Sequence, residues 1–227
     1  MISRVLENCQ KATHPDIHFE SYAVTDSDEV ENHLKSTGGN VVRVDDDVIS
    51  GTLRIELAYK RFFENKKYDL VINVQGDEPL LEGSDLVRLA EFHLNNPFEI
   101  TTLVKKQMGF DTAFQDPNKV KVAMSETTGK AFYFSRAGIP FKRDIGVDLH
   151  GSDYWFLHIG VYSYRPEALS QFAKAPVSRL EDLEKLEQLR ALELGMTIGA
   201  METKSVVMGV DHPEDVKKVE EVLNGRK

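Results

Sequence analysis

The stretch Tyr68–Pro79 has the sequence YDLVINVQGDEP, and it decides the fold class. Residues 68–74 are mainly apolar and rich in β-branched side chains, which is typical of a buried central strand in an α/β sheet. Gly76 and Asp77 follow this strand directly. Ligands of open α/β sheets bind outside the carboxyl ends of the strands, so the Gly-Asp pair is well placed for a site. The stretch therefore predicts a central strand that ends at a candidate ligand loop.

Strand-like and helix-like patterns alternate on both sides of this stretch, which predicts an α/β layered fold. Expected strands cover residues 21–25, 40–44, 119–124, 131–135, 156–165 and 197–201, and expected helices cover 1–12, 26–36, 50–65, a segment from Ser84, 180–194 and 213–224. Strands predominate between residues 101 and 165. We therefore expect one domain over residues 1–227 with a β-rich lobe at about 101–165.

The composition excludes several classes of protein. The chain has 227 residues, of which 41% are hydrophobic and 29% charged, and this fits a globular protein. Its net charge of −9 argues against nonspecific nucleic-acid binding, which needs clustered Lys and Arg. Because no run of eighteen apolar residues occurs, we expect no membrane span. Cys9 is the single cysteine, which excludes a disulfide framework and favours a cytoplasmic location.

Two acidic loops are candidates for metal binding. Asp77 offers a hard oxygen to Mg²⁺, which takes one or two protein carboxylates beside phosphate oxygens. The same Gly-Asp-x-Pro pattern is equally typical of an ordinary turn. Asp211 precedes a helix start at Pro213, where a role as helix cap would be enough to explain it. The local patterns leave both alternatives open.

Other polar groups could bind a substrate. The segment Ser50-Gly51-Thr52 at a helix start offers hydroxyls and backbone N–H groups to an anion or a base. His158 and Tyr162 are four residues apart in a strand and share a face, which fits a core or a pocket equally well. Arg136 and Arg143 lie near a strand end, where each could clamp a carboxylate or remain a solvated surface charge.

Several short motifs in a fixed order resemble the 3-deoxy-manno-octulosonate (Kdo) cytidylyltransferase family. The matching segments are residues 24–26, 50–52 with Arg54, 71–79, 118–122, 133–137, 139–141, 143–144, 158–162, 186–190 and 210–215. The resemblance implies a Rossmann-like nucleotidyltransferase fold with a mixed central sheet, a β-rich insertion for dimerisation and sugar binding, and a homodimer. It also implies Mg²⁺-dependent transfer of CMP from CTP to an eight-carbon acidic sugar, Kdo or 8-amino-Kdo, with release of pyrophosphate, for lipopolysaccharide biosynthesis.

The resemblance also implies a role for each matching residue. Asp77 and Asp211 would share the catalytic Mg²⁺. The sugar side would be lined by Arg136, Arg143, His158, Tyr162, Glu187 and Gln188, and the nucleotide side by Ser50, Gly51, Thr52, Arg54 and Gln75. These residue types suit nucleotidyl transfer, which needs positioning and charge neutralisation more than a covalent nucleophile.

The chain departs from the family pattern in two places. The family usually has a His two residues before Ser-Gly-Thr and an acidic residue after it, where this chain has Val48 and Leu53. Family members also begin with a strand and a phosphate-binding loop of the form Pro-Ala-Arg-x-x-Ser-x-Arg-x-Pro-x-Lys, whereas Met1-Ile2 matches the helix after that loop. We therefore expect this chain to lack that segment and to be impaired in activity.

Two other functions compete with this interpretation. A non-catalytic family member that binds or dimerises with a complete paralogue is favoured by the expected loss of the loop. The retained Asp77 and Asp211 argue against it, because an inactive copy needs no metal ligands. A glycosyltransferase of related topology would need an Asp-x-Asp metal loop. The match at residues 26–28 is better explained as a strand end and helix cap.

Overall fold

The computed structural model describes residues 1–227 except 49, 144–152, 207, 211 and 226–227. The chain forms two compact units, one of residues Met1–Glu91 with Ser205–Lys227 and the other of residues Phe92–Lys204. The range expected for the β-rich lobe, 101–165, lies inside the second unit. No helix in the described part of the chain has both the length and the apolar character that crossing a membrane requires.

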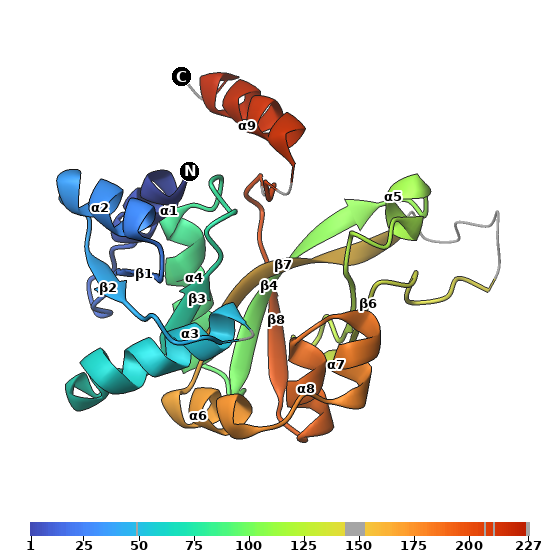
Figure 1. Cartoon of the computed structure of the whole chain (residues 1–227). Coiled ribbons are helices and arrows are strands. Elements are labelled where there is room, and N and C mark those ends of the chain that lie inside the picture. The colour runs from blue at the N-terminus through green and yellow to red at the C-terminus, as the bar shows by residue number, and fades with distance from the viewer. Residues whose placement is uncertain (49, 144–152, 207, 211, 226–227) are drawn as a thin grey trace. The chain divides into compact units, whose positions relative to one another are not determined.

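A small parallel sheet covered by helices forms part of the first unit (Figure 1). The first unit contains α1 (Ile2–Gln10), β1 (Ala23–Thr25), α2 (Asp28–Ser36), β2 (Val41–Arg43), α3 (Gly51–Ala58), β3 (Val71–Val74), most of α4 (Gly83–Leu94) and α9 (Pro213–Gly225), and its small sheet consists of β1 and β2. Strand β1 pairs with β2, and the buried side chains of Leu6, Ala23 and Leu34 join α1, β1 and α2 in one apolar cluster. Burial of these faces stabilises short elements that would not form alone.

Local signals in the sequence set where these helices begin and end. Ser27 caps α2 and Ser50 caps α3, each hydroxyl accepting a hydrogen bond from the backbone N–H three residues later, as predicted. Gly38 follows α2 with a φ of 75°, a conformation that glycine adopts without steric cost. The predicted helix over residues 50–65 is helical throughout, but it changes to a π-helix at Tyr59–Phe63 and a 3₁₀-helix at Glu64–Lys66.

A mixed sheet forms the core of the second unit. The elements of the second unit are β4 (Ile100–Met108), α5 (Thr112–Gln115), β5 (Lys121–Met124), β6 (Ala131–Ser135), β7 (Tyr154–Tyr164), α6 (Pro166–Lys174), α7 (Arg179–Glu184), α8 (Gln188–Glu193) and β8 (Ile198–Glu202). The strand order is β6-β5-β7-β4-β8, with β4 and β8 parallel and the other pairs antiparallel. Figure 1 shows β4 and β8 side by side. The mixed sheet expected from the resemblance is confirmed.

The prediction of one continuous helix over residues 180–194 is wrong. Helix α7 ends at Glu184, and Lys185 adopts a left-handed conformation with a φ of 52° before α8 begins at Gln188. The Glu184 carboxylate accepts hydrogen bonds from the Arg136 backbone N–H at 2.7 Å and from the Ser135 hydroxyl at 2.8 Å. These contacts to strand β6 accompany the break, and a periodic pattern of leucines cannot anticipate them.

The central strand predicted over residues 68–74 is shorter and less buried than expected. Only residues 71–74 form a strand, and Asn73 is the one fully buried residue among them. Lys67, with a φ of 53°, ends the preceding helix, so residues 67–70 serve as the connection. The short helices α5 and α6 were not predicted.

Candidate functional site

The two acidic loops predicted to bind metal lie together in the first unit. The Val210 backbone N–H donates a hydrogen bond to the Asp77 carbonyl oxygen at 2.9 Å. A Cβ built on Gly209 would lie 3.7 Å from Glu78 Oε1. Asp211 itself lies outside the described residues, so its joint role with Asp77 stays a prediction. Its immediate neighbour in the chain nevertheless contacts the Asp77 loop directly.

Part of the predicted nucleotide side also comes together. A Cβ built on Gly51, the exposed first residue of α3, would lie 3.9 Å from Gln75 Oε1. The Ser50 hydroxyl accepts a hydrogen bond from the Leu53 N–H at 3.4 Å, so it acts as a helix cap. Thr52 is buried, with 4% of its surface exposed. Of these three residues, Gly51 is therefore the one that is exposed, and it lies beside the Gln75 side chain.

Arg54 links the start of α3 to the two short strands. Its guanidinium pairs with Asp26 Oδ2 at 2.7 Å and donates a hydrogen bond to the Val44 carbonyl oxygen. Asp28 pairs with Arg43 at 2.6 Å, and Ser27 between the two aspartates is the cap of α2. These bonds confirm that residues 26–28 form a strand end and helix cap. They give Arg54 a structural role, while its predicted contact with nucleotide stays a prediction.

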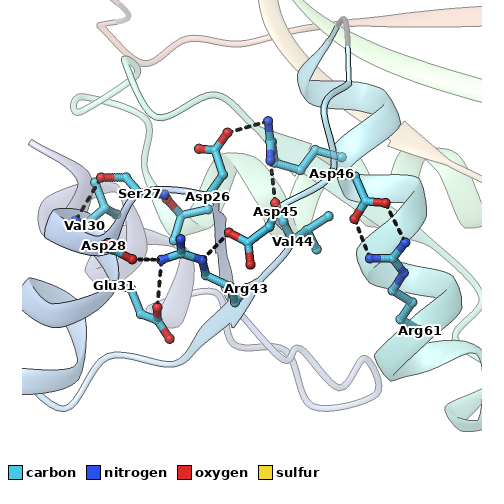
Figure 2. A network of polar contacts seen from close by, with 12 residues as sticks. Asp26, Ser27, Asp28, Val30, Glu31, Arg43, Val44, Asp45, Asp46 and Arg61 are labelled. Atoms are coloured by element: carbon cyan, nitrogen blue, oxygen red, sulfur yellow. Dashed lines mark hydrogen bonds and ion pairs between the residues drawn. The ribbon is translucent and has the colours of Figure 1, made fainter.

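Two further arginines form ion pairs with the acidic loop before Ser50, which contains Asp45 and Asp46. Sequence reasoning missed both pairs. Figure 2 shows Arg43 pointing to Asp45, with a distance of 2.6 Å from Nε to Oδ1. Arg61 donates two hydrogen bonds to Asp46, at 2.5 and 2.8 Å, and thereby lowers the pKa of that carboxyl. Arg61 is fifteen residues from Asp46, so no local pattern signals the pair.

The predicted sugar-side residues belong to the second unit, and a β-bulge places two of them in contact. The ring centroids of His158 and Tyr162 are 5.2 Å apart, although four residues of regular strand span about 13 Å. Thr102 lies opposite Tyr162 while the next residue, Leu103, lies opposite Ile159, so two residues of β7 have no counterpart on β4. The prediction that both rings share a face is confirmed, and the bulge explains why they are also in contact.

Burial keeps both rings uncharged. It lowers the pKa of His158 to about 3, so the imidazole is neutral near pH 7. Burial also raises the pKa of Tyr162 well above 10, with smaller contributions from Tyr164 and the Glu187 carboxylate. The Phe134 ring packs edge-to-face on His158 at a centroid distance of 5.2 Å. His158 and Tyr162 can therefore act on a ligand as hydrogen-bonding groups and not as charges.

Glu187 and Gln188 follow the break between α7 and α8. Glu187 Oε2 and Gln188 Nε2 are buried, and neither atom has a hydrogen-bond partner among the described residues. Buried polar atoms in native proteins are nearly always paired, and leaving one unpaired costs about 1–3 kcal/mol. One acceptor and one donor could therefore each form a hydrogen bond with a polar group from outside the described residues.

The two predicted arginines of the sugar side differ in their surroundings. The Arg136 guanidinium donates hydrogen bonds to the carbonyl oxygens of Glu184 at 2.6 Å, Pro117 at 3.0 Å and Lys185 at 3.4 Å. It therefore holds the end of α7 against strand β6. Arg143 is exposed and immediately precedes the residues outside the described part. Glu184, which Arg136 contacts, was missed because its spacing suggests one more charge on an outer helix face.

Comparisons with known proteins agree with the resemblance in the sequence. A family model described as cytidylyltransferase matches residues 1–198. The 3-deoxy-manno-octulosonate cytidylyltransferase of Rickettsia prowazekii (strain Madrid E) is 38% identical over 218 residues, covering 96% of this chain and 82% of that protein. The 3-deoxy-manno-octulosonate cytidylyltransferase 2 of Hydrogenovibrio crunogenus is 38% identical over 233 residues, covering 99% and 88%.

A solved structure supports the same assignment at the level of the fold. It is a CMP:2-keto-3-deoxy-manno-octonic acid synthetase complexed with CTP, with a TM-score of 0.86 and 28% sequence identity. The match covers 100% of this chain and 88% of that one. The Rossmann-like nucleotidyltransferase fold with a mixed central sheet is thereby confirmed. This chain belongs to the cytidylyltransferase family, within the group formed by the 3-deoxy-manno-octulosonate cytidylyltransferases.

Proposed function

We propose that the chain transfers CMP from CTP to the anomeric hydroxyl of an eight-carbon acidic sugar, releasing pyrophosphate. The sugar is Kdo or 8-amino-Kdo, and the product serves lipopolysaccharide biosynthesis. The observation that carries the proposal is the pair of buried, unpaired polar atoms on Glu187 and Gln188. The charge of the Glu187 carboxylate raises the pKa of Tyr162, whose ring contacts His158, so these three residues form one cluster in the second unit.

The chemistry of this cluster suits a sugar. Neutral His158 and Tyr162 bind hydroxyl groups by hydrogen bonds, and Glu187 and Gln188 supply one further acceptor and one further donor. The sugar carboxylate requires a cation. A guanidinium carries five N–H donors, so Arg136 retains donors beyond its three carbonyl contacts, and exposed Arg143 is the second candidate.

The nucleotide would be bound by the first unit. Gly51 at the start of α3 brings backbone N–H groups next to the Gln75 side chain, and both suit the polar edge of a base or a ribose. The caps and ion pairs of Ser50 and Arg54 hold this helix start in place. Thr52, being buried, would contribute by packing.

Asp77 and Asp211 fit Mg²⁺ by the chemistry of their donors. Mg²⁺ takes hard oxygens and needs only one or two protein carboxylates when phosphate oxygens complete its shell. The Val210–Asp77 hydrogen bond brings the two loops to one place. Over the described residues no cluster of three or more His, Cys, Asp or Glu is present, and two carboxylates meet the requirement. When bound, the ion would neutralise the triphosphate and lower the pKa of the attacking hydroxyl.

The decisive experiment measures pyrophosphate released from CTP by the purified chain with Kdo and Mg²⁺. We expect turnover that depends on all three, and a loss of at least about a hundredfold in Asp77→Asn, because a metal carboxylate is removed. Asp69→Asn, an exposed carboxylate before the same strand, is the control and should keep full activity. Activity of Asp77→Asn equal to the control would contradict the proposed metal role.

The same preparation separates the alternatives. Calorimetry that shows Kdo binding without turnover would fit a partner that binds the sugar, whereas neither binding nor turnover would fit a partner that only dimerises. Either result would contradict the proposed transferase. We also propose a homodimer, which light scattering would test, and a cytoplasmic location.

A further inference from the structure

The side chain of Thr102 fills the bulge of strand β7. It is fully buried, and its Oγ1 lies 2.7 Å from the Val161 carbonyl oxygen and 3.2 Å from the Ile159 carbonyl oxygen. Its third contact is His158 Nε2 at 3.1 Å. A bulge leaves local backbone groups without ladder partners, and here one hydroxyl meets both carbonyls and the imidazole.

Counting hydrogens at this hydroxyl fixes the state of the imidazole. A threonine hydroxyl has one hydrogen, and a carbonyl oxygen can only accept it. The contact to Val161 is the shortest of the three, so the hydrogen is directed to the carbonyls. The contact to His158 is then a hydrogen bond that Nε2–H donates to Thr102 Oγ1. In a neutral imidazole with its hydrogen on Nε2, Nδ1 is an acceptor.

The rest of the imidazole is held from several sides. The Phe134 and Tyr162 rings both pack on it at centroid distances of 5.2 Å. The backbone N–H of His158 donates to the Val120 carbonyl oxygen at 2.8 Å, which fixes the strand at this residue. A ring fixed in this way presents the same nitrogen each time a ligand arrives.

We propose that Thr102 is a positioning residue of the sugar site: it sets the Nε2–H tautomer of His158 and so leaves Nδ1 to accept a hydrogen bond from a sugar hydroxyl. This inference rests on the proposed sugar-binding role of His158. It also predicts which sugars bind. As an acceptor, Nδ1 can bind a sugar group that donates a hydrogen bond, such as a hydroxyl, but not an ether or carbonyl oxygen at the same position.

The test combines a tautomer measurement with kinetics. Two-bond ¹H–¹⁵N correlation spectra of ¹⁵N-histidine-labelled protein show which ring nitrogen carries the hydrogen, and a His158→Gln spectrum assigns the signal. We expect Nε2–H in the wild type and in Thr102→Ser, which keeps the hydroxyl. Thr102→Val keeps the shape without the hydroxyl and should give a mixture of tautomers. Its KM for Kdo should rise about tenfold, as for one lost hydrogen bond, with KM for CTP unchanged.

Thr101→Val is the matched control. Thr101 is the neighbouring residue on β4, equally buried, and its Oγ1 has no hydrogen-bond partner within the described ranges. Removing that hydroxyl should change neither the His158 tautomer nor either KM. An equal rise in the KM for Kdo in both valine variants would overturn the positioning role, since any buried hydroxyl would then have the same effect.

Two further results would overturn the inference. One is a hydrogen on Nδ1 of His158 in the wild type. This measurement needs only the wild-type protein, so it can be made even if Thr102→Val does not fold. The other is a valine variant with an unchanged tautomer and an unchanged KM for Kdo. If the wild type does not bind Kdo, the proposed function itself fails, and the sugar-free spectrum distinguishes that failure from a wrong tautomer.

Discussion

Glu181 and Arg190 form a buried ion pair that joins α7 to α8 across the break at Lys185. The Arg190 and Glu181 side chains are 2% and 8% exposed. Arg190 donates two hydrogen bonds to the carboxylate, at 2.7 Å from Nε and 2.5 Å from a terminal nitrogen. The guanidinium also lies 4.5 Å above the Phe172 ring. We predict that Glu181→Gln destabilises the protein strongly.

The expected magnitude follows from burial. Removing one partner of a buried pair leaves an uncompensated charge and costs about 3–5 kcal/mol. Glutamine keeps one acceptor oxygen for the guanidinium, so we expect the lower end, about 3 kcal/mol. For a chain of this size, each kcal/mol lowers Tm by about 2–4 °C, which gives a decrease of roughly 6–12 °C.

Urea unfolding followed by circular dichroism measures the loss in free energy of unfolding. The control is Asp182→Asn on the same helix, which breaks a pair with Lys185 whose side chains are 67% and 73% exposed. Exposed pairs contribute about 0–1 kcal/mol. Replacing both charges, as in Glu181→Leu with Arg190→Met, should recover much of the loss, because no lone charge stays buried.

A loss below about 1 kcal/mol for Glu181→Gln, similar to the control, would refute this reasoning. Such a result would mean that water reaches the guanidinium and solvates it once the carboxylate is gone. A double variant less stable than Glu181→Gln would also contradict the prediction, because it would show that lost packing, and not an unpaired charge, causes the loss.

Two other predictions concern stability. Burial lowers the pKa of His158 to about 3 and of His93 to about 4, from about 6.5 in the unfolded chain, so stability is full above pH 6.5 and falls as the pH decreases toward 4. Urea midpoints between pH 4 and 8 measure this, and a flat profile would contradict neutral burial. A Cβ on Gly199 would lie 2.3 Å from a phenylalanine ring, so Gly199→Ala should cost about 1–3 kcal/mol in thermal unfolding. Gly225→Ala should leave Tm nearly unchanged, because no side chain of the described residues lies within 4 Å of the added Cβ.

The features that sequence reasoning predicted well are local. The caps at Ser27 and Ser50 depend on one side chain and a backbone N–H three residues away, so a short window contains both partners. Helix α9 and strand β8 likewise follow from nearby periodicity and a turn signal.

The features that sequence reasoning missed depend on partners far away in the chain. The contact between His158 and Tyr162 needs a bulge against β4, which lies more than fifty residues earlier. The break at Lys185 accompanies bonds from Glu184 to strand β6, about fifty residues away. Such pairings leave no period in the sequence, so the sequence could show that His158 and Tyr162 share a face but not that their rings are in contact.

The ion pairs around the loop before Ser50 affect the electrostatic attraction that the proposed nucleotide substrate would experience. Arg43, Arg54 and Arg61 each lie within 2.7 Å of a carboxylate oxygen, so their positive charge is largely compensated within the protein. A free tetra-anionic nucleotide that approaches a chain of net charge −9 would then be repelled at long range. Under the proposed function, a nucleotide that already carries a divalent cation would meet less repulsion, so its rate of binding should rise with free magnesium.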